Sequence, residues 1–394
     1  MPIPLPIDCL RVFALGLVLT LTAGMAAAFD TPARAAFVMD HDTGTVLFEK
    51  NADLPLPPAS MSKLMTIYLA LEAVRDGRLD LDQRLPVSPH AMSYGGSTMF
   101  LDTTDTVTVD ELLKGIIVLS GNDASAVIAE ALSPDRSEAG FAQLMNERAR
   151  QLGMTNSTFA NSNGWPDPIQ RMSVRDLGIL ANRIITDFPD FYPYFAMQTY
   201  EFDGRAPANT RNRNPLLSMG IGADGLKTGH TQEAGYGLVG SGTRDGRRTI
   251  FVVSGLESEG QRAREAAAIL DWSFRHFTPK TLAQAGEKVG TADVWLGRRN
   301  SVDLVVGDAL NVLLPVPTQD TVEAEIRYDG PVQAPITKGQ ELGRIVILRG
   351  DELEPMSRPL LAAEDVKDGG YFARVKLSAQ FLLSWIGSFI PGLT

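Results

Sequence analysis

The chain has 394 residues, a formal net charge of −11, 44% hydrophobic residues and 21% charged residues. This length is enough for two or three domains with substantial cores, and the composition is that of an ordinary globular protein. The acidic balance argues against a nucleic-acid partner, because binding to phosphates needs an excess of lysine and arginine.

The first 28 residues have the pattern of a secretory signal peptide. An apolar run at residues 12–28 follows Arg11 and ends in three alanines, which predicts cleavage before Phe29. A retained membrane anchor is the alternative, although a run of this length is at the short limit for spanning a bilayer. Cys9 is the only cysteine and precedes the run, so a chain cleaved there has no thiol for a disulfide or for cysteine catalysis.

The first chemical motif lies at the start of a predicted helix. Residues 36–40 and 44–49 predict a β-hairpin, and a proline cluster then leads into Pro58-Ala59-Ser60-Met61-Ser62-Lys63. From there apolar residues recur at helical spacing until Asp76-Gly77. Ser60 and Lys63 therefore face the same way. The positive end of the helix and the apolar neighbours disfavour a protonated amine, so Lys63 can act as a base toward Ser60.

Two further motifs occur later in the chain. Asp110 is the expected N-cap of a helix that ends at Leu119 and presents Ser120-Gly121-Asn122 before a second helix. The third motif, Lys227-Thr228-Gly229, precedes an alternating, strand-like segment. The other expected elements of this region are an exposed loop at 93–97, helices at 141–152, 171–186 and 261–277, and paired strands at 236–241 and 248–255.

The order of the three motifs along the chain indicates that they belong together. Ser-x-x-Lys and Ser-x-Asn each arise by chance about once or twice in such a chain, whereas Lys-Thr-Gly is expected ~0.1 times. Penicillin-binding proteins and class A β-lactamases carry these motifs in this order. With the wider wording around Ser120 and from Asp224 to Thr231, the chain resembles the low-molecular-weight penicillin-binding proteins that are serine-type D-alanyl-D-alanine carboxypeptidases. The resemblance extends over nearly the whole sequence.

The resemblance implies an α+β fold. Residues 29–278 would form a D,D-peptidase domain of the transpeptidase/β-lactamase-like type, with a five-stranded antiparallel sheet, helices on both of its sides and an additional helical region. The active site would lie where the helical region meets the sheet. After Thr278-Pro279, short β-type runs with turn signals predict a small all-β domain at residues 279–368.

Site roles follow from the same resemblance. Ser60 would attack the carbonyl between two D-alanines, Lys63 would take its proton, and Ser120 would relay that proton to the leaving amine. The backbone N–H groups of Ser60 and His230 would form the oxyanion hole, with a His230 general base as the weaker alternative. Arg213 and Arg262 would add positive charge to the carboxylate pocket; the alternative is that both only form surface salt bridges. The substrate-binding set implied by the family is Asn122, Arg213, Lys227, Thr228, Gly229, His230 and Arg262.

The last segment, residues 369–394, is predicted to form an amphipathic helix. Apolar residues, among them Trp385 and Phe389, gather on one face, and Arg374 and Lys376 lie on the other. This pattern is typical of a helix in a membrane interface; docking on the β domain or on a second copy is the alternative. We therefore expect a periplasmic protein attached to the outer face of the inner membrane. Its expected partners are peptidoglycan stem peptides ending in D-Ala-D-Ala, β-lactam antibiotics as covalent inhibitors, and that membrane surface.

Other classes of protein fit less well. A class A β-lactamase needs a glutamate that activates water, and no Glu-x-x-Leu-Asn lies between the second and third motifs, where Glu130 and Glu147 are the nearest acids considered. A D,D-endopeptidase of the same fold and a catalytically silent binding protein stay open as alternatives. The histidines are isolated, which argues against a metal site. No metal or other cofactor is expected.

Overall fold

The structure is a computed structural model that describes residues 29–318, 320–371 and 375. Within residues 29–276, two strands from the beginning of this stretch and three from its end form one antiparallel sheet. Its strand order is β2-β1-β7-β6-β5. Both hairpins expected from the sequence are present, and the sheet has the five strands that the family resemblance implied. The strands are β1 (Ala35–Asp40), β2 (Val46–Lys50), β5 (Ala223–Thr231), β6 (Gly235–Arg244) and β7 (Arg247–Leu256).

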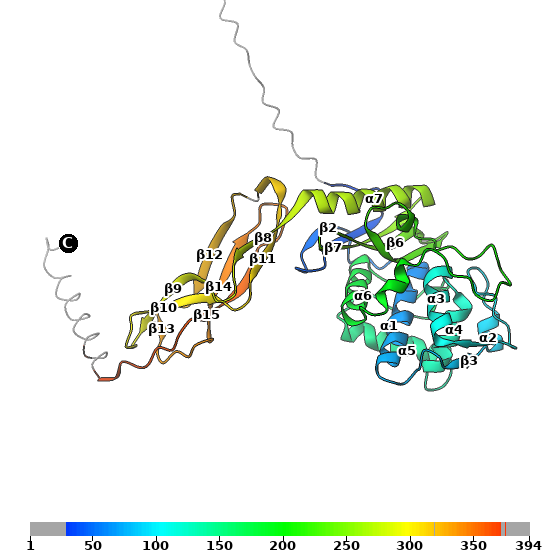
Figure 1. Cartoon of the computed structure of the whole chain (residues 1–394), viewed down its shortest axis with the longest axis horizontal. Helices are drawn as coiled ribbons and strands as arrows, with labels where there is room; N and C mark the ends of the chain where they lie inside the picture. Colours follow the sequence, from blue (N-terminus) through cyan, green and yellow to red (C-terminus); the bar gives the residue numbers. More distant parts are fainter. Residues whose placement is uncertain (1–28, 319, 372–374, 376–394) are drawn as a thin grey trace, which may run out of the picture. The chain divides into compact units, whose positions relative to one another are not determined.

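Helices cover both faces of this sheet (Figure 1). Helix α7 (Glu259–His276) packs on β6 and β7, so closely that a Cβ on Gly242 would lie 2.8 Å from Leu270. Helix α6 (Val174–Asp187) packs on β1 and β7 from the other side. Because both faces are covered, the central strands are almost continuously apolar.

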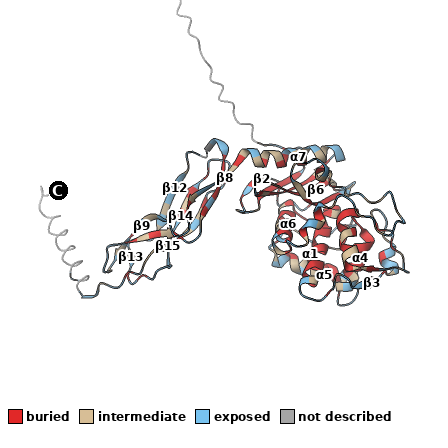
Figure 2. Ribbon diagram, in the orientation of Figure 1, coloured by how far each residue is buried: buried red, intermediate tan, exposed pale blue. Residues whose placement is uncertain are grey.

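The helical region is built around α1 (Lys63–Arg75). Its residues 63–73 are all buried (Figure 2), which explains why its sequence is apolar on every side. The surrounding elements are α2 (Pro89–Met92), α3 (Val109–Lys114), α4 (Asn122–Leu132), α5 (Glu138–Gln151) and a short hairpin of β3 (Arg84–Pro86) and β4 (Thr106–Thr108).

The expected cap at Asp110 is wrong. The N-cap of α3 is Thr108, whose hydroxyl accepts from the Glu111 backbone N–H at 3.1 Å, while the Glu111 carboxylate accepts from the Thr108 N–H at 2.9 Å. This reciprocal capping box satisfies two free N–H groups at once. Asp110 lies inside the helix and pairs with Lys114 at 2.6 Å.

The C-terminal region is rich in β structure, as expected. One sheet has the order β12-β14-β15-β10-β9-β13, and β8 pairs with β11 in a separate two-stranded sheet. Strands β8 and β15 were not predicted, because Pro279 and Pro359 lower the strand signal of their segments. The strands are β8 (Phe277–Ala283), β9 (Lys288–Trp295), β10 (Ser301–Val306), β11 (Leu310–Pro315), β12 (Glu323–Tyr328), β13 (Val332–Gln333), β14 (Glu341–Leu348) and β15 (Met356–Ala362).

Two expected segments, the signal peptide at residues 1–28 and the amphipathic helix after residue 371, lie outside the described residues, apart from residue 375. Within the described part of the chain, no helix has the length and apolar character needed to span a bilayer.

A buried ion pair joins the neighbouring strands β1 and β7, and its arginine also reaches the last turn of α7. Arg247 lies 3.1 Å from Asp40, with side chains 9% and 1% exposed, and also donates to the backbone carbonyls of Ser273 and Phe277. Replacing Arg247 by Met leaves the Asp40 carboxylate buried without a counter-charge, so we expect the free energy of unfolding of this domain to fall by about 3–5 kcal/mol in urea titrations.

The matched control is Arg275→Met on the exposed face of α7, where the arginine side chain is 75% exposed. It should change the free energy of unfolding by less than about 0.5 kcal/mol. Equal effects of the two substitutions would contradict a special role for the buried pair.

Candidate active site

Ser60 lies on a tight 3₁₀ turn, Ala59–Ser62, that runs directly into α1. It therefore precedes the α-helix, whereas the sequence pattern placed it in the first helical turn. The three-residue spacing still aligns Ser60 with Lys63, because side chains at positions i and i+3 eclipse in a 3₁₀ helix. Ala59 has a left-handed backbone with φ of +48°, which is uncommon for a residue other than glycine and is often found beside functional groups.

The Lys63 amine is fully buried among three oxygen atoms. Its Nζ lies 2.9 Å from Ser60 Oγ, 2.7 Å from Asn122 Oδ1 and 2.5 Å from the Asn163 backbone oxygen. Burial and, to a smaller extent, the positive charge of Arg213 lower the pKa of Lys63 to about 7. A neutral amine has two protons and one lone pair. It can therefore donate to Asn122 and Asn163 while accepting the proton of Ser60.

Ser120 and Asn122 lie on the sharp bend between two helices. A π-helical turn, Gly115–Leu119, ends at Ser120 in the left-handed conformation with φ of +63°, and α4 starts at Asn122. The Asn122 side chain donates to the Gly95 carbonyl at 2.8 Å, and its backbone N–H donates to the Ser97 carbonyl at 2.7 Å. The exposed loop expected at residues 93–97 therefore does border the site.

Lys227 approaches the same point from the sheet. Its Nζ lies 2.9 Å from Ser120 Oγ and 3.3 Å from the Thr228 carbonyl, and its side chain is buried. Burial holds the pKa of Lys227 well below its usual value, and the charges of Lys63, Arg213 and Arg262 add to this effect. Several cations thus converge on one partly closed space, which favours an anionic ligand there.

Gly229 allows β5 to pass close to the Ser60 turn. A Cβ at this position would lie 2.8 Å from the Pro58 carbonyl oxygen and 3.0 Å from Met61, so any larger residue would push the strand away from the nucleophile. Thr228 is buried, and His230, two residues further along β5, is exposed. The His230 ring stacks on Tyr236 with centroids 3.9 Å apart.

The two arginines lie at the outer side of the Lys227 region. Arg213 donates to the Ser97 hydroxyl. Arg262 is buried over the Tyr236 ring, 5.6 Å from its centroid, and forms a 2.9 Å ion pair with Glu259. Arg262 thus forms the ion pair that was considered as the alternative to a site role. The positive charge of Arg262 also lowers the pKa of Lys227.

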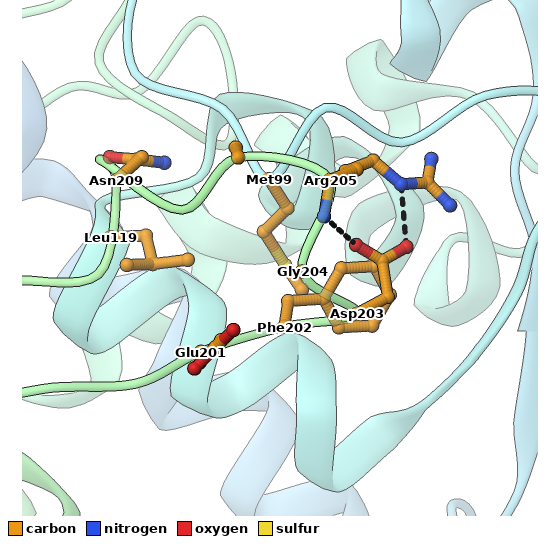
Figure 3. Close-up of a pocket in the computed structure, with 9 residues that line it drawn as sticks. Met99, Leu119, Glu201, Phe202, Asp203, Gly204, Arg205 and Asn209 are labelled. Atoms are coloured by element: carbon orange, nitrogen blue, oxygen red, sulfur yellow. Dashed lines mark hydrogen bonds and ion pairs between the residues drawn. The ribbon is translucent and has the colours of Figure 1, made fainter.

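A second loop, residues 201–209, lies against Met99 and Leu119, the residue before Ser120 (Figure 3). Arg205 pairs with Asp203 at 2.5 Å and with Asp105 at 2.8 Å, and the Asn209 side chain donates to the Thr98 carbonyl at 2.9 Å. The hollow that remains against Met99 and Leu119 holds about 10 Å³, the space of about one water molecule. It is too small for a substrate, and the Arg205–Asp105 ion pair ties this loop to the segment before β4.

The sequence predicted a loop at residues 156–167, but not that the Asn163 carbonyl within it contacts Lys63. A Cβ on Gly164, which has φ of +81°, would lie 1.9 Å from the Ala59 carbonyl oxygen. The Asn161 side chain accepts from the backbone N–H groups of Gly164 at 2.8 Å and of Trp165 at 3.1 Å. The Asn-Gly pair was visible in the sequence as a possible turn, but nothing local indicated that a carbonyl within it meets the lysine.

Glu138 is the acid that contacts this loop. The sequence analysis had instead considered Glu130 and Glu147 as the nearest candidates for a water-activating glutamate. The Glu138 carboxylate accepts from the Ser162 N–H at 2.9 Å and hydroxyl at 2.5 Å, and from the Tyr94 hydroxyl at 2.5 Å. Burial raises its pKa, but these hydrogen bonds outweigh that effect and hold the pKa below its usual value. Among the described residues, no group of three or more His, Cys, Asp or Glu side chains could hold a metal ion.

Comparisons with known proteins agree with this geometry. The family profile described as D-alanyl-D-alanine carboxypeptidase matches residues 22–258, and the one described as penicillin-binding protein 5, C-terminal domain, matches residues 277–368. D-alanyl-D-alanine carboxypeptidase DacC of Escherichia coli is 37% identical over 353 residues, which are 87% of this chain and 86% of the relative.

Two solved structures extend the comparison. Penicillin-binding protein 5 from Haemophilus influenzae is 33% identical with a TM-score of 0.76, covering 86% of this chain and 99% of that chain. Penicillin-binding protein D2 from Listeria monocytogenes, in its ampicillin-bound form, is 30% identical with a TM-score of 0.57, covering 63% of this chain and 100% of that one. With the Ser60, Ser120 and Lys227 motifs assembled in one place and both profiles matched, the chain belongs to the D-alanyl-D-alanine carboxypeptidase family of low-molecular-weight penicillin-binding proteins.

Proposed function

We propose that the protein is a serine D-alanyl-D-alanine carboxypeptidase that removes the terminal D-alanine from peptidoglycan pentapeptide stems. The observation that carries this proposal is the fully buried amine of Lys63, 2.9 Å from the hydroxyl of Ser60 and with a pKa of about 7. A base with this pKa is half neutral at physiological pH, which suits it to remove a proton and to return it.

The reaction proceeds through an acyl-enzyme on Ser60. Neutral Lys63 takes the hydroxyl proton as Ser60 Oγ attacks the carbonyl between the two D-alanines, and the backbone N–H groups of Ser60 and His230 stabilise the oxyanion. Ser120 passes a proton to the leaving amine, and the C–N bond breaks. Water then attacks the ester and restores the Ser60 hydroxyl, while Asn122 holds the substrate amide and the Lys63 side chain.

The terminal carboxylate of the substrate binds at the cation-rich end of the site. Lys227 supplies charge and Thr228 a hydroxyl, and Arg213 and Arg262 add positive potential from the outer side. Burial, and in addition the cationic neighbours, hold the pKa of Lys227 well below its usual value in the free protein, so a bound carboxylate would raise this pKa and favour the protonated form. The negative charge of the substrate carboxylate thus favours the protonated Lys227 that binds it.

Glu138 argues against the β-lactamase alternative. Its carboxylate oxygens are occupied by Ser162, Tyr94 and His90, which leaves the group as a support for the loop instead of a base for water. We therefore expect β-lactams to form a long-lived acyl-enzyme on Ser60, as the ampicillin-bound Listeria relative suggests.

Removal of the Ser60 hydroxyl should abolish this chemistry. Ser60→Ala should form no penicillin adduct and release no D-alanine from diacetyl-Lys-D-Ala-D-Ala, with mass spectrometry measuring the adduct and an amino-acid assay measuring D-alanine. Lys63→Ala should slow acylation by at least about 10³-fold, because the nucleophile loses its base.

The matched control is Ser62→Ala, two residues along the same turn, where the buried hydroxyl donates to the Ala59 carbonyl at 3.0 Å. This variant should still acylate. An adduct on Ser60→Ala would show that another residue is the nucleophile.

The pH dependence of acylation should report the Lys63 amine. The base is active when neutral, so the second-order rate constant for penicillin acylation should rise about tenfold per pH unit below 7 and level off above about 8. Stopped-flow measurement between pH 5.5 and 9 tests this expectation. A rate that still rises tenfold per pH unit between pH 8 and 9 would mean that Lys63 keeps an ordinary lysine pKa, which contradicts the proposal.

We further propose that a signal peptide at residues 1–28 exports the chain to the periplasm and that residues 369–394 attach it to the outer face of the inner membrane, with domain boundaries near residues 278 and 368. Support comes from the apolar N-terminal run and from the one-sided apolar pattern of the tail, whose Arg374 and Lys376 suit anionic lipid.

Deleting residues 372–394 should move the protein from the membrane fraction to the soluble fraction, as measured by cell fractionation and immunoblotting. Hydrolysis of soluble peptides should stay within about twofold of the full chain, because no site residue lies in the tail. If the truncated protein stays in the membrane fraction, attachment comes from elsewhere, with an uncleaved N-terminal run as the first suspect.

A further inference from the structure

The Glu138 carboxylate joins two segments that lie far apart in the sequence. Glu138 belongs to the first turn of α5, and its side chain is 9% exposed. Its Oε1 accepts from the Ser162 N–H at 2.9 Å and hydroxyl at 2.5 Å, both in the loop at residues 161–165. Its Oε2 accepts from the Tyr94 hydroxyl at 2.5 Å and lies 2.9 Å from His90 Nε2. One buried side chain therefore links the two loops.

The first of these loops carries a hydrogen-bond partner of the base. Ser162 is fully buried, and its carbonyl accepts from the Thr66 hydroxyl on α1 at 2.5 Å, while Glu138 holds its N–H and its hydroxyl. All polar groups of Ser162 are thus fixed by the protein. The next carbonyl along the chain, that of Asn163, lies 2.5 Å from Lys63 Nζ. Its direction therefore depends on how Ser162 is held.

The second loop carries the support of the other partner. Tyr94, which donates to Glu138, directly precedes Gly95, and the Gly95 carbonyl accepts from the Asn122 side-chain amide at 2.8 Å. The oxygen of the same amide lies 2.7 Å from Lys63 Nζ. Both protein groups that bind Lys63 besides the nucleophile are therefore connected to the Glu138 carboxylate through one short stretch of backbone each.

We propose that Glu138 is a positioning residue for acylation, whose carboxylate holds the two loops that orient the Lys63 amine toward Ser60. The inference rests on the acyl-enzyme chemistry of the proposed function. A neutral lysine has one lone pair, which faces Ser60 only while its two protons are given to Asn122 and Asn163. A shift of either loop would turn the lone pair away, and a misplacement of about 1 Å can slow a reaction about 10²-fold.

Glu138 also acts on Lys63 through its charge. Hydrogen bonds hold the pKa of Glu138 below its usual value, so the group is ionised at neutral pH. Burial and the charge of Arg213 lower the pKa of Lys63, whereas the negative charges of Asp123 and Glu138 raise it. Lys227 is a further charged group that interacts with Lys63. Removing only the charge of Glu138 should therefore lower the pKa of Lys63.

Two substitutions separate position from charge. Glu138→Ala should slow penicillin acylation of the full chain about 10²-fold in stopped-flow measurements, because both loops lose their tie. Glu138→Gln should recover most of this loss, since its amide oxygen can accept from Ser162 and its amide N–H can donate to the Tyr94 oxygen. The midpoint of the pH profile of acylation should at the same time move to a lower pH in Glu138→Gln than in the wild type.

The matched control is Glu147→Ala, at an exposed glutamate of the same helix, which should change neither the rate constant nor the midpoint. Rate constants come from the time course of adduct formation, so an inactive fraction does not lower them. Acylation of Glu138→Ala at the wild-type rate, an equal loss in Glu138→Gln, or an unchanged midpoint in Glu138→Gln would overturn the inference. A wild-type chain that forms the penicillin adduct but releases no D-alanine from peptides would instead overturn the proposed function, and the acylation rates of the variants would still decide the role of Glu138.

Discussion

The burial of one amine is the constraint on which this site depends. Lys63 Nζ has no contact with solvent, so its hydrogen bonds must come from the protein, and they come from three separate segments: the nucleophile turn, the start of α4 and the loop at Asn163. A misplaced segment would leave a buried polar group unsatisfied, which costs about 1–3 kcal/mol. The same burial lowers the pKa of Lys63 to about 7, so one interaction both fixes the geometry and prepares the base.

The active-site cleft is lined by basic side chains, although the chain as a whole is acidic. The protein carries a formal charge of −11, yet Lys63, Lys227, Arg213 and Arg262 converge on one space. There burial, and in addition the charges of Lys63, Arg213 and Arg262, lower the pKa of Lys227. Clustering like charges costs folding free energy, and active sites commonly carry such costs. Here the cost is relieved by an anion, so a terminal carboxylate is both recognised and used to complete the charge distribution of the site.

Close backbone approaches hold the pieces together. Gly229 brings β5 against Pro58, and Gly164 brings its loop against the Ala59 carbonyl of the same turn. Ala59 itself has a left-handed backbone between these two contacts. The turn that bears Ser60 is therefore clamped between an edge strand and a loop. The Glu138 carboxylate accepts hydrogen bonds from Ser162 in that loop and from Tyr94.

The sequence by itself determined the family, the order of the three motifs and most strands and helices, because motif chemistry and apolar periodicity are local properties. It misplaced the cap of α3, since Thr108 and Asp110 are both good caps and only the reciprocal bond with Glu111 decides between them. It missed β15, whose proline weakens the strand signal. Tertiary structure alone decided that the Asn163 carbonyl meets Lys63 across a hundred residues, and that Glu138 supports this loop in place of Glu130 or Glu147. A backbone carbonyl has no signature in sequence, and such contacts exist only once α1, α5 and the sheet have packed.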